Sequence, residues 1–116
     1  MNQRNLVTTV RKPNPSIGII DIQGDVTSAA ENALMDAFSE ASNGSARTIL
    51  LNFSGLDYMN SSGIGLLVTL LIRTQRQKQK LLACGLSEHY EEIFKLTRLN
   101  EAIGIYADET EALAAV

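Results

Sequence analysis

Two adjacent serines, Ser61 and Ser62, are the residues of this sequence whose type and setting best suit chemistry. They stand in the stretch YMNSSGIG, between the end of one apolar run and the glycine-containing start of another. A serine hydroxyl can cap a helix, or it can act as a nucleophile. Capping by Asn60 or by one of the serines would suffice structurally, but it does not explain a doubled serine beside Tyr58 and Met59. A turn from strand to helix at the edge of an α/β sheet is where ligands and partners usually bind.

Catalysis by the chain itself is not favoured. The sequence has no G-x-S-x-G elbow, no Walker loop and no G-x-G-x-x-G fingerprint. Gly63 and Gly65 have the spacing of the first two glycines of that fingerprint, but the third glycine is absent. One histidine, His89, and one cysteine, Cys84, cannot form a usual zinc cluster. We expect His89 at the surface and Cys84 in the core, and we predict no enzyme activity, no metal and no cofactor.

The composition bounds the class of protein. With 116 residues, 45% hydrophobic and 20% charged, the chain suits one domain that covers residues 1–116. A net charge of -3 makes nucleic acid an unfavourable partner. The apolar run 63–72 is shorter than the roughly 20 residues of a membrane-spanning helix. The polar run 73–80 that follows lacks the aromatic residues of a membrane anchor, so we expect no membrane partner. A single cysteine cannot form an internal disulfide, and the first residues contain no long apolar stretch of the signal-peptide type. We therefore predict a cytoplasmic protein.

Short apolar segments, typical of buried strands, alternate along the chain with segments whose apolar residues recur at helical spacing. Capping-box spacings at Ser28 to Glu31 and at Asp108 to Glu111 predict two helix starts, and Asn43-Gly44 predicts the end of the first helix. We expect strands at 6–10, 16–22 and 47–56 and within 80–86 and 102–107, and helices at 30–41 and 62–79, within 87–99 and after 108.

This alternation favours an α/β fold, because parallel neighbouring strands need crossover connections of about this length. We predict a mixed, mostly parallel sheet of about five strands with about four helices.

The stretch LDYMNSSGIGLLVTLL, preceded by TILLNFS and followed by KLLACGLSEHYEEIFKLTRL, resembles the signature of the STAS domain, named after sulphate transporters and anti-sigma factor antagonists. The resemblance runs from Leu6 to about Leu113 and is greatest to free-standing bacterial anti-anti-sigma factors. It implies the STAS fold and a regulatory binding module.

In such systems the first serine of the pair, here Ser61, is phosphorylated by a partner kinase that is also the anti-sigma factor. Ser62 is the second choice. The unphosphorylated protein binds the kinase, the sigma factor is released, and a phosphatase resets the switch, with ATP belonging to the partner. The residues expected to bind the partner are Tyr58, Met59, Asn60, Ser62, Gly63 and Ile64.

The chain departs from the best-known members at two positions. They carry Asp before the first serine, where this chain has Asn60, and another Asp where it has Thr27. Asn keeps the capping ability but loses the charge. Loss of the customary Asp leaves room for an alternative, a non-enzymatic subunit of a lipid-transport ATP-binding-cassette system. A third possibility, a scaffold subunit of a stress-signalling complex, would need self-association that nothing in the sequence encodes. The sequence does not indicate an oligomeric state.

Overall fold

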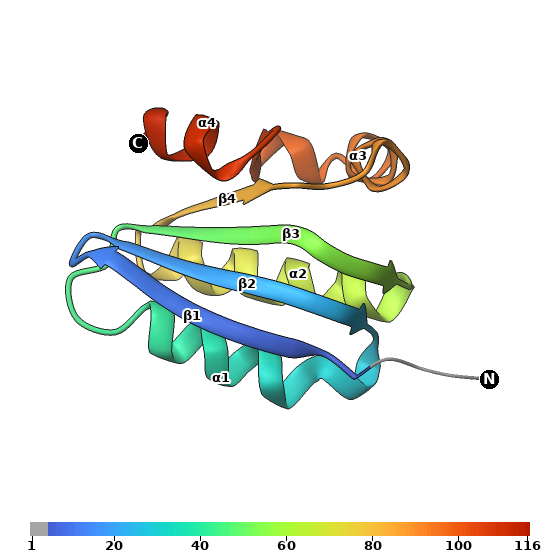
Figure 1. The fold of residues 1–116 in the computed structure, drawn as a ribbon, viewed down its shortest axis with the longest axis horizontal. Helices are drawn as coiled ribbons and strands as arrows, with labels where there is room; N and C mark the ends of the chain where they lie inside the picture. Colours follow the sequence, from blue (N-terminus) through green and yellow to red (C-terminus); the bar gives the residue numbers. More distant parts are fainter. Residues whose placement is uncertain (1–4) are drawn as a thin grey trace.

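The computed structural model describes residues 5–116, in which helices pack against a five-stranded sheet (Figure 1). The order of strands and helices is the one that the sequence predicts, with two short 3-10 turns added. In chain order the elements are β1 (Val7–Asn14), β2 (Ile17–Val26), η1 (Ser28–Ala30), α1 (Glu31–Ala41), β3 (Thr48–Met59), α2 (Ser61–Arg76), β4 (Lys80–Cys84), α3 (Glu88–Leu96), η2 (Leu99–Glu101), β5 (Gly104–Tyr106) and α4 (Glu109–Ala114).

The strands lie in the order β1-β2-β3-β4-β5 across the sheet. β1 and β2 form an antiparallel pair, and every other neighbouring pair is parallel. The predicted mixed, mostly parallel sheet is therefore confirmed. Because β2, β3 and β4 run in the same direction, the loops that follow them meet at one edge of the sheet.

The larger core lies between one face of the sheet and the helices α1, α2 and α3. Alternate residues of the central strands face this core, as the two-residue period of a strand requires. The rings of Phe53 and Phe94 meet edge to face there, with centroids 6.4 Å apart. The helical residues in this core are Leu34, Ala37, Phe38 and Ala41 of α1, Leu66, Leu67 and Leu70 of α2, and Tyr90 and Phe94 of α3.

A smaller core covers part of the other face, where α4 places Ala112 on the sheet. Ile19, Leu50 and Cys84 are buried in it. Strand β3 is thus covered on both faces over its first half, which explains its unbroken apolar run. Burial raises the pKa of the Cys84 thiol to about 11, and nearby carboxylates add to that shift. Its core position confirms the prediction for this cysteine.

The ends of several elements differ from the sequence prediction, and β2 runs four residues further than predicted, to Val26. β1 continues beyond Val10 through Pro13, which an edge strand tolerates because an edge residue can do without a ladder hydrogen bond. β3 continues beyond Leu56 to Met59. α2 begins one residue earlier than predicted and ends at Arg76.

The two predicted capping boxes have different outcomes. Asp108 caps α4, and its Oδ1 accepts a hydrogen bond of 2.8 Å from the N–H of Glu111, as predicted. The prediction for Ser28 is wrong. Thr27 is the cap, because its Oγ1 accepts from the N–H of Ala29 at 3.3 Å and a 3-10 turn precedes α1.

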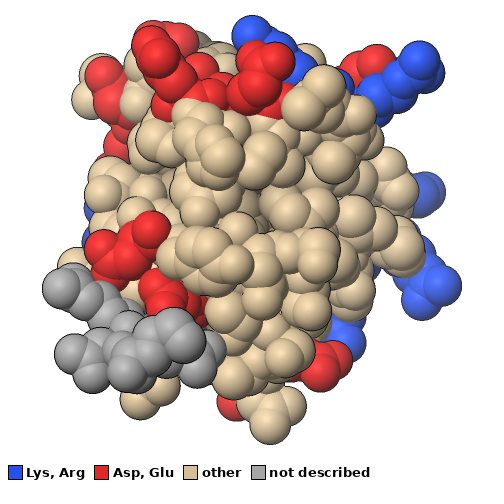
Figure 2. Space-filling model, turned by 90° about the vertical axis from the view of Figure 1, so that its right-hand side faces the viewer, with Lys and Arg blue, Asp and Glu red and all other residues tan. Residues whose placement is uncertain are grey.

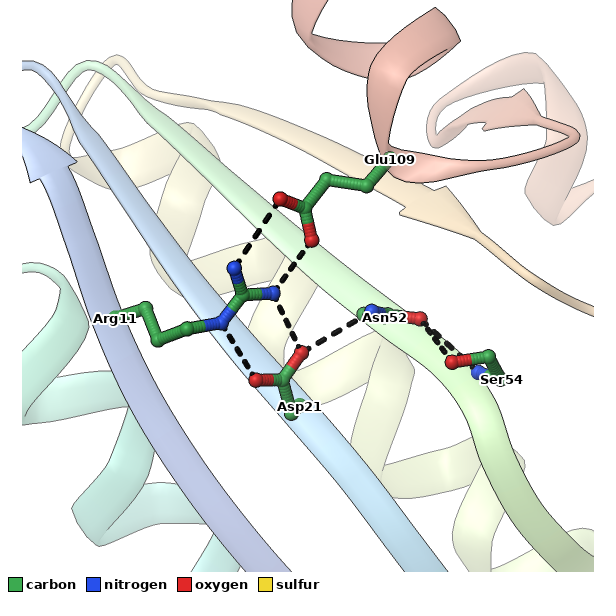
Figure 3. Close-up of polar contacts among 5 residues, drawn as sticks. All are labelled: Arg11, Asp21, Asn52, Ser54 and Glu109. Atoms are coloured by element: carbon green, nitrogen blue, oxygen red, sulfur yellow. Dashed lines mark hydrogen bonds and ion pairs between the residues drawn. The ribbon is translucent and has the colours of Figure 1, made fainter.

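A polar network, which we call the Arg11 network, joins β1, β2 and α4 on the face that carries the smaller core (Figure 3). Arg11 donates to the Asp21 carboxylate from Nε at 2.7 Å and from Nη2 at 2.8 Å. It donates to Glu109 from Nη1 at 3.1 Å and also from Nη2. Asn52 donates to Asp21 at 3.1 Å, and Ser54 donates to Asn52. The network therefore holds the short helix α4 against the sheet.

The same contacts shift the titration of both partners. The hydrogen bonds from Arg11 are the main reason that the pKa of Asp21 lies below its ordinary 3.8. The pKa of Arg11 is raised, chiefly by its hydrogen bond to Asp21.

We predict that Asp21→Asn lowers the free energy of unfolding near neutral pH. A carboxyl whose pKa is depressed by folding stabilises the native state above its unfolded pKa, and this contribution disappears as pH falls through the folded pKa. The difference between wild type and variant should therefore be full near neutral pH and shrink below pH 3.8. Urea unfolding at several pH values measures it, with Asp36→Asn on the exposed side of α1 as the control. A difference between wild type and Asp21→Asn that stayed constant with pH would contradict this account.

Candidate functional site

The site is built where β2 and β3 end side by side. Val26 and Met59, the last residues of these strands, are paired in register. The N–H of Asn60 then donates to the carbonyl oxygen of Val26 at 3.3 Å, and α2 begins at Ser61. The first turns of η1 and α2 consequently lie next to each other at the carboxyl edge of the sheet.

Asn60 is the N-cap of α2. Its side-chain Oδ1 accepts from the N–H of Gly63 at 3.0 Å, and its carbonyl oxygen accepts from the N–H of Ile64 at 3.0 Å. The backbone of Asn60 is extended, as expected for a cap. Capping, which the sequence left open among three residues, thus falls to Asn60. Both serines are therefore available for another role.

Ser61 and Ser62 form the first turn of α2, and both are exposed. The N–H groups of a first helical turn have no partner within the helix, and the helix dipole makes this end electropositive. α2 is 16 residues long and has no acidic residue in its first turn. The two hydroxyls therefore lie at a place that can accommodate negative charge.

Gly63 and Gly65 are not equivalent. A Cβ atom on Gly63 would lie 2.2 Å from the carbonyl oxygen of Val26 and 2.8 Å from Cγ of Met59, so this position requires glycine. A Cβ atom on Gly65 would meet nothing within 4 Å. Gly63 brings the helix onto the strand end, whereas the described structure gives no packing reason for Gly65.

Met59 lies in the core and not at the surface. Its exposed fraction is 4%, and its N–H donates to the hydroxyl of Tyr90 at 2.8 Å. Met59 was expected to bind a partner, but its side chain is buried in the larger core beneath the site. Gly63 is also buried. No signal in the sequence indicated that the hydroxyl of Tyr90 accepts a hydrogen bond from this strand end.

The other expected contact residues differ in exposure. Tyr58 projects from the end of β3 with an exposed fraction of 51%, which makes it the large exposed side chain next to the serines. Ile64 is half-buried and packs partly against the larger core. Asn60 is half-buried by its capping role.

Charge is distributed unevenly around this end of the molecule. Figure 2 views the end at which β3 finishes and α2 begins, and uncharged side chains fill its centre. Acidic groups border this centre above and at the lower left, and basic groups project along the right edge. The centre of this end of the molecule is therefore an uncharged surface.

The remaining predictions about chemistry concern His89, metals and membranes. His89 is exposed, as predicted, and its ring lies edge-on to Tyr90 with centroids 4.8 Å apart. Within residues 5–116 there is no group of three or more His, Cys, Asp or Glu side chains placed to hold a metal ion. Among the helices formed by the same residues, none has both the length and the apolar character needed to cross a membrane.

The chain that forms this site matches a known family. The family model described as STAS domain matches residues 9–112. This chain belongs to the STAS domain family. The match covers most of the chain and includes all of the sheet except the first two residues of β1, together with α1, α2, α3 and the serine pair.

Solved STAS-fold structures resemble this one over nearly their whole length. An anti-sigma factor antagonist from Mycobacterium paratuberculosis is 17% identical, with 97% of this chain and 94% of that chain covered and a TM-score of 0.82. The anti-sigma factor antagonist SpoIIAA in its unphosphorylated form is 18% identical, with coverage of 94% and 96% and a TM-score of 0.73. The phosphorylated form of SpoIIAA, a Bacillus cell fate determinant, is 22% identical, with coverage of 94% and 98% and a TM-score of 0.73. At these identities the likeness shows the STAS fold.

We predict opposite effects of alanine at the two glycines. Gly63→Ala should lower the free energy of unfolding by about 1 to 3 kcal/mol, the usual cost of overpacking, because the new methyl group meets backbone that cannot move aside. Gly65→Ala should raise it by about 0.5 to 1 kcal/mol, because alanine is the better helix former at an open position. Urea unfolding followed by circular dichroism measures both variants. Equal effects would show that the contact between Gly63 and Val26 does not govern the stability of this edge.

Proposed function

We propose that this protein is an anti-sigma factor antagonist that is switched by phosphorylation of Ser61. In its unphosphorylated form it binds an anti-sigma factor that is also a serine kinase, and the sigma factor is released. Phosphorylation ends this binding, and a phosphatase restores it. The observation that carries the proposal is an exposed serine pair at the start of a capped helix, in a STAS fold shared with antagonists.

Within this proposal the chain is a substrate and a binding partner, not a catalyst. The kinase supplies ATP and the catalytic groups, and the STAS domain presents the serine to them. We place both proteins in the cytoplasm, where ATP is available. Ser61 is the proposed acceptor because it is the first serine of the pair, and Ser62, one residue further into the helix, is the second choice.

The comparison with SpoIIAA supports the proposed switch, because the structure of that antagonist has been solved both unphosphorylated and phosphorylated. A phosphate on Ser61 would add about 1.5 to 2 negative charges at neutral pH. The electropositive start of α2 partly balances this charge. The fold should therefore survive the modification.

Binding should not survive it, because the contact surface is uncharged. The residues proposed to contact the partner around Ser61 carry no charge, so a phosphate covered there would have to lose water without a matching cation from this chain. Loss of about a hundredfold in affinity requires only about 2.7 kcal/mol, and an unpaired buried charge costs at least that much. Ser61 thus acts as a switch through desolvation and needs no change of fold.

The proposed contact surface comprises Tyr58, Asn60, Ser62 and Ile64 around Ser61, with the backbone of Gly63 beneath it. Tyr58 is the aromatic anchor, because exposed tyrosines that become buried contribute heavily to binding. Asn60 keeps the cap of α2 without adding a charge to the surface. The side chain of Met59 is left out because it is buried.

We predict that Ser61→Asp binds the partner kinase at least about a hundredfold more weakly than wild type while keeping its melting temperature within a few degrees. Ser61→Ala should bind but should not be phosphorylated. Each purified anti-sigma factor kinase of the source organism is titrated calorimetrically with wild type, and the kinase that binds is then used with the variants and with ATP.

Ser39→Asp is the matched control, because Ser39 is an exposed serine near the far end of α1. It adds the same charge away from the site and should leave binding unchanged. Mass spectrometry locates the phosphate. Phosphate on Ser62 in wild type would move the switch by one residue, and the absence of binding to every kinase would overturn the proposed function.

A further inference from the structure

The outer side of α2 repeats the apolar spacing of its inner side. The buried residues Gly63, Leu66, Leu67 and Leu70 follow the i, i+3, i+4, i+7 pattern of a helix face packed on a core. Starting two residues later, the same spacing gives an outer stripe that is exposed to solvent. Its members are Gly65, Val68, Thr69 and Ile72.

The outer stripe exposes aliphatic surface. The exposed fractions are 38% for Val68 and 43% for Ile72, which lie one turn apart. The hydroxyl of Thr69 donates back to the carbonyl oxygen of Gly65 at 3.2 Å, so it is satisfied within the helix. A helix with apolar residues on two sides is typical of a helix that is buried on both. In this structure only the inner side is buried.

Gly65 leaves room on the stripe for the backbone of another helix to come close to α2. It lowers helix stability relative to alanine, and no neighbour within residues 5–116 requires it. A glycine on an exposed helix face lets the backbone of another helix come near, which a side chain would prevent. The stripe begins one turn after Ser61, so it continues directly from the serine surface.

Basic residues lie at the far end of the stripe. α2 contains no Asp or Glu, and Arg73 and Arg76 occupy its last turn, although the whole chain has a net charge of -3. Neither arginine forms an ion pair within the described part of the chain. Lys78 and Lys80 follow. At 1.5 Å per residue, Arg76 lies roughly 22 Å from Ser61 along the helix.

We propose that the outer face of α2 docks a helix of the partner kinase, with aliphatic residues against Val68 and Ile72 and acidic residues near Arg73 and Arg76. This inference rests on the proposed function and extends it beyond the serine surface. The stripe is one helix wide, and helix pairs pack with axes about 8 to 10 Å apart where small residues allow it. A lipid surface fits less well, because the stripe has two aliphatic side chains and no aromatic residue.

Three sets of variants test the docking face against the kinase that binds wild type. Gly65→Gln fills the place of close approach with a residue that favours a helix. Val68→Gln with Ile72→Gln removes the aliphatic contacts. Arg73→Gln with Arg76→Gln removes the charges. The control is Leu96→Gln with Lys95→Gln on α3, an aliphatic and basic pair outside α2 whose aliphatic member is more exposed than Val68 or Ile72.

We expect Gly65→Gln and the double aliphatic variant to bind at least about tenfold more weakly than wild type, while their unfolding midpoints do not fall. The arginine variant should bind more weakly at low salt, and its affinity should change less with salt concentration. The control should bind within about twofold of wild type. These results would support a docked helix.

Wild-type affinity in both Gly65→Gln and the aliphatic variant would overturn the docking face and leave the proposed function intact, because Ser61→Asp tests the serine separately. An equal loss in the α3 control would also overturn it. Vesicles of phosphatidylserine and phosphatidylcholine serve as the other probe. Binding of wild type, but not of the arginine variant, to these vesicles would assign the face to a membrane instead. Failure of wild type to bind any kinase would remove the proposed function itself.

Discussion

The placement of the serine pair depends on one contact, in which Gly63 lies against the carbonyl group of Val26. Since no side chain separates them, the first turn of α2 rests directly on the end of β2, and Asn60 reaches the same carbonyl with its N–H group. Gly63 faces inward, so Ser61 and Ser62, which precede it in the first turn, face outward. The hydrogen bond from Met59 to Tyr90 fixes the neighbouring strand end to α3. Sheet edge and helix start therefore form one rigid unit that presents two hydroxyls.

Local patterns predicted most of this fold, and contacts between distant segments account for what they missed. The cap at Asp108 and the end of α1 near Gly44 depend on neighbours within a few residues, so their spacing was informative. The burial of Met59, which was expected at the partner surface, was missed because it involves α3 more than thirty residues later, through the hydroxyl of Tyr90. The serine pair could be found from sequence and family resemblance, but the outer stripe of α2 could not. The sequence has the same apolar spacing on both sides of the helix, so only the structure shows which of the two sides is exposed to solvent.

The outer face of the sheet, opposite α1 and α2, changes from apolar to polar along the central strands. On the outer face, Ile19 and Leu50 are buried beneath α4, and the next residues facing the same way, Asp21 and Asn52, are polar. A hollow of about 350 Å³ opens at this transition, between the Arg11 network and the bulged end of β2. Gly24 has a positive φ of 94° at that bulge, which accounts for the glycine after Gln23. The unbroken apolar runs of β2 and β3 thus give way to alternation with polar residues where α4 stops covering the outer face.

The parallel pairing of β2 with β3 also determines how this protein should move. Ile17 pairs with Thr48, so the chain must close a crossover of about thirty residues before the central sheet exists. Topologies rich in such distant pairings fold slowly, and their central strands open only with the whole domain. Ser61 is attached to the end of that central pair and not to a loop that opens by itself. Its encounter with another protein should therefore follow diffusion and surface fit, without waiting for an internal motion of this chain.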